Sequence, residues 1–297
     1  MKASTSRYLN IRGLRYHVRE WGREGAPRLF LLHGWMDASV SFQFVVDALA
    51  ADWHVIAPDW RGFGLSAWAG DAYWFPDYFA DLDAVLDAWE PDRPARLVGH
   101  SLGGNVALMY AGIRPERVDK VVALDAFGLI ERTAAEAPAR YRKWLDDIRA
   151  PMAFRPYADF DALAARLQRD NRRLDPVRAA WLARHLGEDD GAGGVRLRGD
   201  PAHRRVNPVL YRRAEAEACW RGVRAPVLWI EPDPPELRRR IGIGDDLHAA
   251  ARACFADLEV VSVADAGHNL HHDQPQAVAR IVEAFLLSQK DREEAHA

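Results

Sequence analysis

The sequence predicts an α/β protein built on a mostly parallel β-sheet with helices on both faces. Short apolar runs recur along the chain without the alternation of a half-exposed strand, as expected for parallel strands covered on both faces. Stretches with apolar residues at helical spacing separate these runs. A serine also stands between two glycines where one apolar run gives way to a helical segment, which is typical of such folds.

The predicted strands begin with an antiparallel hairpin. Leu14, Tyr16 and Val18 alternate with Arg15, His17 and Arg19, which is the period of a strand with one face covered. The later strands lack this alternation and are predicted at residues 29–32, 54–57, 96–98, 121–124, 227–230 and 258–263. Helices are predicted between them, over residues 79–89 and 105–111 and from Pro275 onward.

The pattern changes between residues 128 and 215. Strand-like runs disappear there, and arginine-rich helical segments at 162–171 and 177–186 replace them. We therefore predict a core formed by residues 1–127 and 216–297, with a helical cap inserted at 128–215. Residues 187–199 are glycine-rich and are expected to form a flexible link within the cap.

The segment Gly99-His100-Ser101-Leu102-Gly103 predicts a nucleophile. It follows one predicted strand and precedes a helix, and the two glycines remove side chains that would collide in a tight strand-to-helix turn. Such a turn holds the serine in a strained conformation with its Oγ exposed. A serine hydroxyl is a poor nucleophile at neutral pH, so it requires a base, a group that orients the base and donors for the oxyanion.

The sequence offers candidates for the base and the oxyanion donors. His268 follows the predicted strand 258–263 and lies on a loop, where an imidazole can move between nucleophile and leaving group. The backbone N–H of Leu102 follows the serine, and that of Trp35 follows the turn His33-Gly34. We expect these two amides to form the oxyanion hole.

Four separated motifs follow one another along the chain. They are His33-Gly34-Trp35, the segment 59–66 (DWRGFGLS), the turn around Ser101, and Gly267-His268. Together they resemble the α/β-hydrolase superfamily over nearly the whole chain, and residues 33–39 are similar to its serine hydrolase-like subgroup. The resemblance implies an eight-stranded, mostly parallel sheet and a cap inserted after the strand that ends at Asp125.

The acid of the catalytic triad has two candidate locations. The family's usual position falls on or beside Pro235, but neither Asp233 nor Glu236 stands at the expected offset, and three prolines stiffen that loop. Some relatives carry the acid at the end of the preceding strand instead, where this chain has Asp125. We predict Asp125 as the acid, with the Asp233 to Glu236 loop as the alternative.

The expected substrate is a small-molecule ester that is anionic or aromatic. Phe127, His100 and Trp68 are candidates to line an apolar pocket for a bulky acyl group. Basic residues outnumber acidic ones between 131 and 213, although the whole chain has a formal net charge of −3. Such a cap favours substrates with a carboxylate or phosphate. Alternatively, its arginines pair with neighbouring acids on solvated helix faces.

The reaction that these residues predict is ester hydrolysis through a Ser-His-Asp acyl-enzyme mechanism. Within the superfamily, haloalkane dehalogenases and epoxide hydrolases carry an aspartate at the position of Ser101, so both activities are disfavoured. A hydrolase of carbon–carbon bonds of the meta-cleavage-product type would use the same residues. A non-hydrolytic small-molecule binding protein on the same fold is a third alternative.

Composition excludes several other classes. The acidic body lacks a basic stripe with interleaved aromatic residues, so no nucleic-acid partner is expected. The amino end lacks the apolar stretch of a signal peptide, and no apolar run reaches about 18 residues, which predicts a cytoplasmic protein without a membrane span. Cys219 and Cys254 lack motif spacing, as suits a reducing compartment. No organic cofactor is expected. No metal is expected at His271 and His272 either, because no acidic or thiol cluster with ligand spacing accompanies these histidines.

Overall fold

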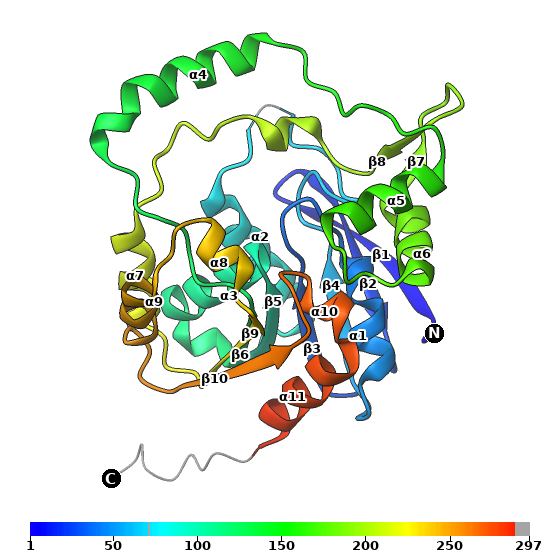
Figure 1. Ribbon diagram of the computed structural model, residues 1–297. Coiled ribbons are helices and arrows are strands. Elements are labelled where there is room, and N and C mark those ends of the chain that lie inside the picture. The colour runs from blue at the N-terminus through cyan, green and yellow to red at the C-terminus, as the bar shows by residue number, and fades with distance from the viewer. Residues whose placement is uncertain (71, 289–297) are drawn as a thin grey trace, which may run out of the picture.

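A twisted eight-stranded sheet forms the centre of the protein (Figure 1). The structure is a computed structural model and describes residues 1–70 and 72–288. The strand order is β1-β2-β4-β3-β5-β6-β9-β10; β2 is antiparallel to β1 and β4, and all other neighbours are parallel. The predicted mostly parallel eight-stranded sheet is confirmed. Its strands are β1 (Ser4–Ile11), β2 (Leu14–Trp21), β3 (Arg28–Leu32), β4 (His54–Pro58), β5 (Ala95–His100), β6 (Val118–Leu124), β9 (Val227–Asp233) and β10 (Leu258–Ala264).

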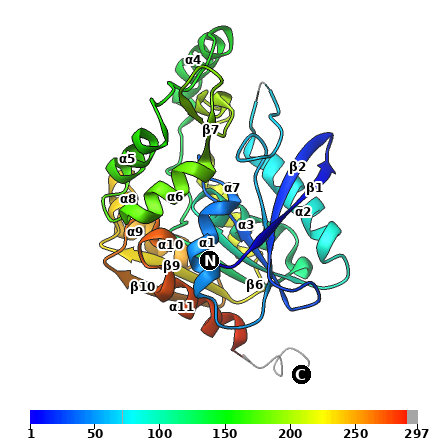
Figure 2. The same ribbon diagram turned by 90° about the vertical axis from the view of Figure 1, so that its right-hand side faces the viewer.

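Helices cover both faces of this sheet (Figures 1 and 2). Side chains of the parallel strands alternate between two apolar clusters, so Leu97 and Val121 face one layer while Val98 and Val122 face the other. The first layer is formed by α2 (Phe75–Trp89), α3 (Leu102–Ile113), α7 (Arg213–Arg221) and α9 (Asp245–Arg252). The second is formed by α1 (Gln43–Ala48) and α11 (Pro275–Leu287), together with the short helix α10 (Leu270–Asp273). The short helix α8 (Glu236–Arg240) packs Leu237 against the first layer.

Two strands differ from the expected burial. β10 was expected to be covered on both faces, but Val263 is its single fully buried residue because β10 forms the edge of the sheet, beyond the middle that the helices cover. On β2, the face opposite Tyr16 and Val18 was expected to be open, yet His17 is completely buried. Its Nδ1–H donates to Asp59 Oδ2 at 2.7 Å, so a polar loop closes over this face.

The cap region contains three helices, α4 (Ala137–Arg149), α5 (Phe160–Asp170) and α6 (Pro176–Leu186). The last two pack against each other, and their apolar residues Leu163 and Leu182 belong to a cluster that reaches Val40 and Phe44 of the core. In both views α4 lies farthest from the sheet (Figures 1 and 2), and each of its residues is at least partly exposed. Apolar residues of this helical region therefore contact Val40 and Phe44 through α5 and α6.

The expected flexible link at residues 187–199 is instead a small hairpin. β7 (Gly187–Asp189) pairs antiparallel with β8 (Val195–Leu197), and Tyr157 forms a further bridge to Val195. Gly191 and Gly193 adopt positive φ values of 76° and 91° in the connecting turn, a conformation that glycine reaches without a steric penalty. The glycines that suggested flexibility thus serve a tight turn.

His203 joins the cap to the core. Its ring stacks on Phe63 and Tyr73, with centroid separations of 3.7 and 3.5 Å, and its Nε2–H donates to the Arg61 carbonyl oxygen at 3.1 Å. Burial lowers the pKa of His203 to about 3. The folded protein therefore keeps this imidazole neutral at pH values where the unfolded chain binds a proton.

We expect His203 to make the protein sensitive to mild acid. Its pKa is about 3 in the folded state and near 6.5 when unfolded, so stability falls as the pH decreases from 6.5 toward 3. Between pH 7 and pH 5 this group alone lowers the free energy of unfolding by about 2 kcal/mol. In urea unfolding, the free energy of unfolding of His203→Gln should fall less than that of wild type between pH 7 and pH 5, by this amount. An exposed control, His185→Gln, should behave as wild type, and equal losses in all three proteins would contradict the assignment.

Candidate active site

Ser101 stands at the sharp turn between β5 and α3 with φ 52° and ψ −114°. The flanking glycines are required by direct contact, because a Cβ on Gly103 would lie 2.1 Å from the Leu32 carbonyl oxygen. A Cβ on Gly99 would lie 2.4 Å from the carbonyl carbon of Gly103. The helix can therefore begin directly against the ends of β3 and β5, with Ser101 at the carboxyl edge of the sheet.

Ser101, His268 and Asp125 form one hydrogen-bonded chain. Ser101 Oγ donates to His268 Nε2 at 3.1 Å, and His268 Nδ1–H donates to Asp125 Oδ2 at 2.6 Å. The three residues come from the ends of β5 and β6 and from the loop after β10. The His268 side chain is 29% exposed, whereas that of Asp125 is 1% exposed, so the imidazole is reachable from solvent and the carboxylate is not.

Burial raises the pKa of Asp125 above its ordinary value, and the hydrogen bond with His268 offsets this only in part. The nearby Glu231 carboxylate raises the pKa further. A carboxylate in such surroundings gains strongly from a positive neighbour, because little water is available to solvate its charge. The hydrogen bond from His268 Nδ1–H to Asp125 therefore fixes the orientation of the imidazole ring.

The alternative acids lie elsewhere. Asp233 ends β9 and is exposed, and Glu236 begins α8 and pairs with Arg173 of the cap region at 3.0 Å. His268 Nδ1 instead bonds to Asp125. The structure therefore brings the predicted acid to the histidine and turns the Glu236 carboxylate toward an arginine.

The turn that carries Trp35 is held by His33. His33 Nδ1–H donates to the Gly34 carbonyl at 2.7 Å, while His33 Nε2 accepts from the Trp60 backbone N–H at 2.8 Å. Burial lowers the pKa of His33, which keeps the imidazole in the neutral form that this pattern requires. A Cβ on Gly34 would lie 3.3 Å from Ser101 Cβ, so the turn packs against the serine.

The second predicted oxyanion donor, Leu102, is the first residue of α3. The first amides of a helix have no partner within the helix, so they are available to a ligand at that end. The structure thus places the turn before Trp35 and the start of α3 on either side of Ser101. Sequence reasoning named both donors but missed the role of His33, for which the following Gly34 was the available signal.

Asp59 is a second residue that sequence reasoning did not assign. Its Oδ1 accepts from the Ser39 backbone N–H at 2.7 Å, and its Oδ2 accepts from Leu65 N–H at 2.9 Å and from His17 Nδ1–H. Although burial opposes ionisation, these bonds and the nearby imidazoles hold the pKa of Asp59 far below its ordinary value. Asp59 therefore ties the loop after β4 to the segment that follows the oxyanion turn.

The three predicted pocket residues lie in different surroundings. Phe127 is 3% exposed and packs in the apolar core, whereas Trp68 is 48% exposed. His100 is 2% exposed, and its Nε2–H donates to the His268 carbonyl oxygen at 2.8 Å. His100 and Phe127 are thus buried while Trp68 is exposed, and a substrate pocket shared by the three stays a prediction.

Four arginines line a cavity of about 440 Å³ in the cap region, which we name the arginine-lined cavity. They are Arg155, Arg166, Arg169 and Arg204, together with the apolar residues Phe154 and Leu197. Elsewhere in this region arginines do pair with acids, as in Arg132–Glu136 and Arg196–Glu188. Some basic residues of this region therefore pair with acids, while four arginines line the cavity.

The fold agrees with comparisons to known proteins. The α/β-hydrolase fold family model matches residues 27–275, and the chain belongs to this family. A serine hydrolase-like protein of Danio rerio is 38% identical over 129 residues, which are 43% of this chain and 39% of that protein's length. The 2-(acetamidomethylene)succinate hydrolase of Mesorhizobium japonicum is 27% identical over 297 residues and 95% of each chain.

Solved structures show the same fold. The thioesterase domain from the curacin biosynthetic pathway superposes with a TM-score of 0.83, covering 94% of this chain and 99% of that domain at 23% sequence identity. Among the helices in the described part of the chain, none has the length and hydropathy needed to span a membrane.

Gly103 should be intolerant of any side chain. We expect Gly103→Ala to reduce the free energy of unfolding by several kcal/mol, because the new methyl group collides with the immovable Leu32 carbonyl oxygen. Gly244→Ala is a matched control, since its φ is −69° and no atom of the described residues lies within 4 Å of the added Cβ. Thermal unfolding of both variants measures the difference. Equal unfolding temperatures for the two variants would show that the Leu32 carbonyl oxygen leaves room for a methyl group at residue 103.

Proposed function

We propose that this protein is a serine hydrolase that cleaves carboxylic esters through an acyl-enzyme. The observation that carries the proposal is the hydrogen-bonded chain from Ser101 through His268 to Asp125. This chain supplies a nucleophile, a base and a group that orients the base, which are the parts that acyl transfer requires.

The chemistry follows from these positions. His268 Nε2 accepts the Ser101 proton as Oγ attacks the ester carbonyl, and the amides of Trp35 and Leu102 donate to the oxyanion. The carbon–oxygen bond then breaks, and His268 returns the proton to the leaving alkoxide. Water, deprotonated by His268, attacks the acyl-enzyme and releases the acid with Ser101 reprotonated. Asp125 holds the imidazole and stabilises its charged form throughout.

The relatives support the general class. The Danio rerio relative is named a serine hydrolase-like protein, and the Mesorhizobium japonicum relative hydrolyses 2-(acetamidomethylene)succinate. Ser101 at the nucleophile position is unlike the aspartate of haloalkane dehalogenases and epoxide hydrolases, and therefore disfavours both reactions. A carbon–carbon bond hydrolase uses the same residues and is the second candidate.

We expect Ser101→Ala to lower the turnover of p-nitrophenyl acetate, butyrate or octanoate by a factor on the order of 10⁶. Asp125→Asn should lower it by about 10⁴, because the amide cannot stabilise the protonated imidazole. Steady-state hydrolysis by identically purified proteins measures both effects.

Asp233→Asn and Glu236→Gln are the matched controls for the acid, and both should retain wild-type turnover. Loss of activity in either control with a fully active Asp125→Asn would move the acid to the loop after β9. If the wild type cleaves no ester, hydrolysis of carbon–carbon bonds would be assayed next. If that is also absent, saturable binding of a small molecule without turnover would be measured.

The cap suggests an anionic substrate. The arginine-lined cavity carries four guanidinium groups, of which Arg166 is paired with Asp170. A positive field of this kind raises the local concentration of substrates with a carboxylate or phosphate. The 2-(acetamidomethylene)succinate of the Mesorhizobium japonicum relative is such a compound, which supports the same substrate class here.

Removing two of these charges should affect acidic esters selectively. We expect Arg155→Gln/Arg169→Gln to raise KM about tenfold for a p-nitrophenyl ester of a dicarboxylic acid and to leave KM for the neutral butyrate ester unchanged. Arg23→Gln, at an exposed arginine of the core that pairs with Asp52, is the control. An equal change for both esters would show that the cavity does not select charge.

A further inference from the structure

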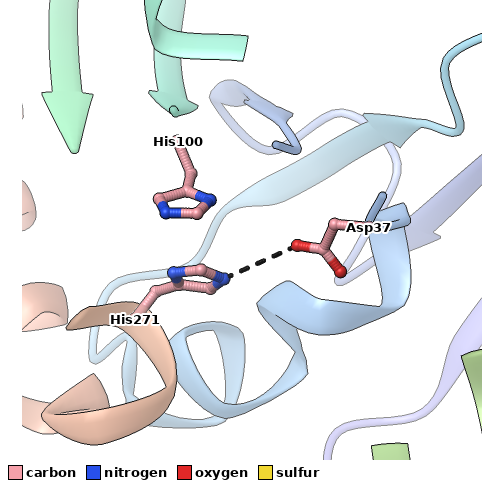
Figure 3. Close-up of side chains that lie close together, drawn as sticks. All are labelled: Asp37, His100 and His271. Carbon is pink, nitrogen blue, oxygen red and sulfur yellow. Dashed lines mark ion pairs between the residues drawn. The ribbon is translucent and has the colours of Figure 1, made fainter. Parts of the chain in front are cut away.

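A cluster of three ligand-type side chains, two buried and one half-buried, lies next to His268 (Figure 3). Asp37 comes from the turn after β3, His100 ends β5, and His271 belongs to α10. One nitrogen or oxygen atom from each residue lies within 4.8 Å of the other two. In Figure 3 both imidazoles and the carboxylate converge on one another. Segments far apart in the sequence thus meet at one point beside the catalytic chain.

The histidines of this cluster have unused ring nitrogens. His100 donates its Nε2–H to the His268 carbonyl, which leaves a lone pair on Nδ1 that has no partner within residues 1–70 and 72–288. His271 is completely buried, and neither of its ring nitrogens has a hydrogen-bond partner in the same part of the chain. Its Nε2 lies 3.8 Å from Asp37 Oδ2. Buried polar atoms without partners are costly, so this arrangement suits an added ligand.

The charges of the cluster fit a cation. Asp37 contributes carboxylate oxygens, of which Oδ2 also accepts from Ser41 Oγ at 2.7 Å, and the two histidines contribute imidazole nitrogens. Two imidazoles and one carboxylate form a donor set typical of divalent transition metals, zinc in particular.

We propose that Asp37, His100 and His271 bind one divalent transition-metal ion, with water completing a four-coordinate site. In a tetrahedral zinc site with bonds of about 2.0 Å, ligand atoms are roughly 3.3 Å apart. The candidate ligand atoms lie within 4.8 Å of one another, so small side-chain movements would bring them to this separation. The sequence analysis expected no metal because it considered only the neighbours His271 and His272, whereas the fold supplies Asp37 and His100.

This site would be coupled to the catalytic histidine, a step that rests on the proposed function. His100 is the link, because its Nδ1 would hold the metal while its Nε2–H holds the His268 carbonyl. A metal on one ring nitrogen makes the other N–H a stronger donor and fixes the orientation of the ring. The loop that carries His268 would then be restrained, and ester turnover would slow while the metal is bound.

Direct binding tests the site without relying on turnover. Isothermal titration calorimetry with ZnCl₂ at neutral pH would compare chelator-treated wild type with His271→Gln and Asp37→Asn. We expect one zinc ion per wild-type chain and a Kd about 100-fold weaker in each variant. His185→Gln, Ser101→Ala and His268→Gln should bind as wild type, because their side chains lie outside the proposed ligand set. Circular dichroism would establish that each variant is folded.

Several results would overturn the proposal. Loss of zinc binding in His268→Gln would make the catalytic histidine the ligand, and a wild-type Kd above about 1 mM would mean that no specific site exists. If the ligand variants fail to fold, electron paramagnetic resonance of Cu²⁺ bound to the wild type decides the matter. Coupling to two imidazole nitrogens supports the site, and any other number contradicts it.

Activity assays then test the coupling separately. Zinc should inhibit wild-type ester hydrolysis, a chelator should restore it, and His271→Gln should lose this response. Stoichiometric binding without inhibition would remove the coupling and leave the site intact. A wild type that binds zinc but cleaves no ester would refute the proposed function alone.

Discussion

The close contact between the start of α3 and the end of β3 is the constraint on which the site depends. Gly103 leaves no room for a methyl group between the helix and the Leu32 carbonyl, and a Cβ on Gly34 would lie 3.3 Å from Ser101 Cβ. Because the helix begins so close to two strand ends, the serine and the oxyanion turn share one small region. A side chain at either glycine would push Ser101 away from the end of β3 and the turn at Gly34.

Buried polar residues hold the loops around this contact. His33 connects the turn at Gly34 to the loop after β4, and Asp59 connects that loop to Ser39 and His17. His100 performs a similar task for the loop of His268. These groups are removed from water and joined by short hydrogen bonds, so each loop has one favourable position. The strained backbone at Ser101 is retained because its surroundings are fixed on every side.

The cap differs from the core in both packing and predictability. α5 and α6 were evident from their helical period, and the apolar cluster between them explains why that period is present. The hairpin β7–β8 was missed, since two very short strands with glycines between them carry no periodic signal. In such short elements pairing with a neighbour decides the structure, and the local sequence does not reveal the neighbour.

The sequence by itself determined the parallel sheet, its helices and the strand-to-helix turn at Ser101, because apolar period and glycine spacing act over a few residues. Tertiary structure decided which carboxylate stands beside His268, since that depends on the register of β6 and β9 and on the path of the loop after β10. It also decided that His100 faces inward to Asp37 and His271. Contacts between distant segments depend on strand order and helix packing, which no local pattern encodes.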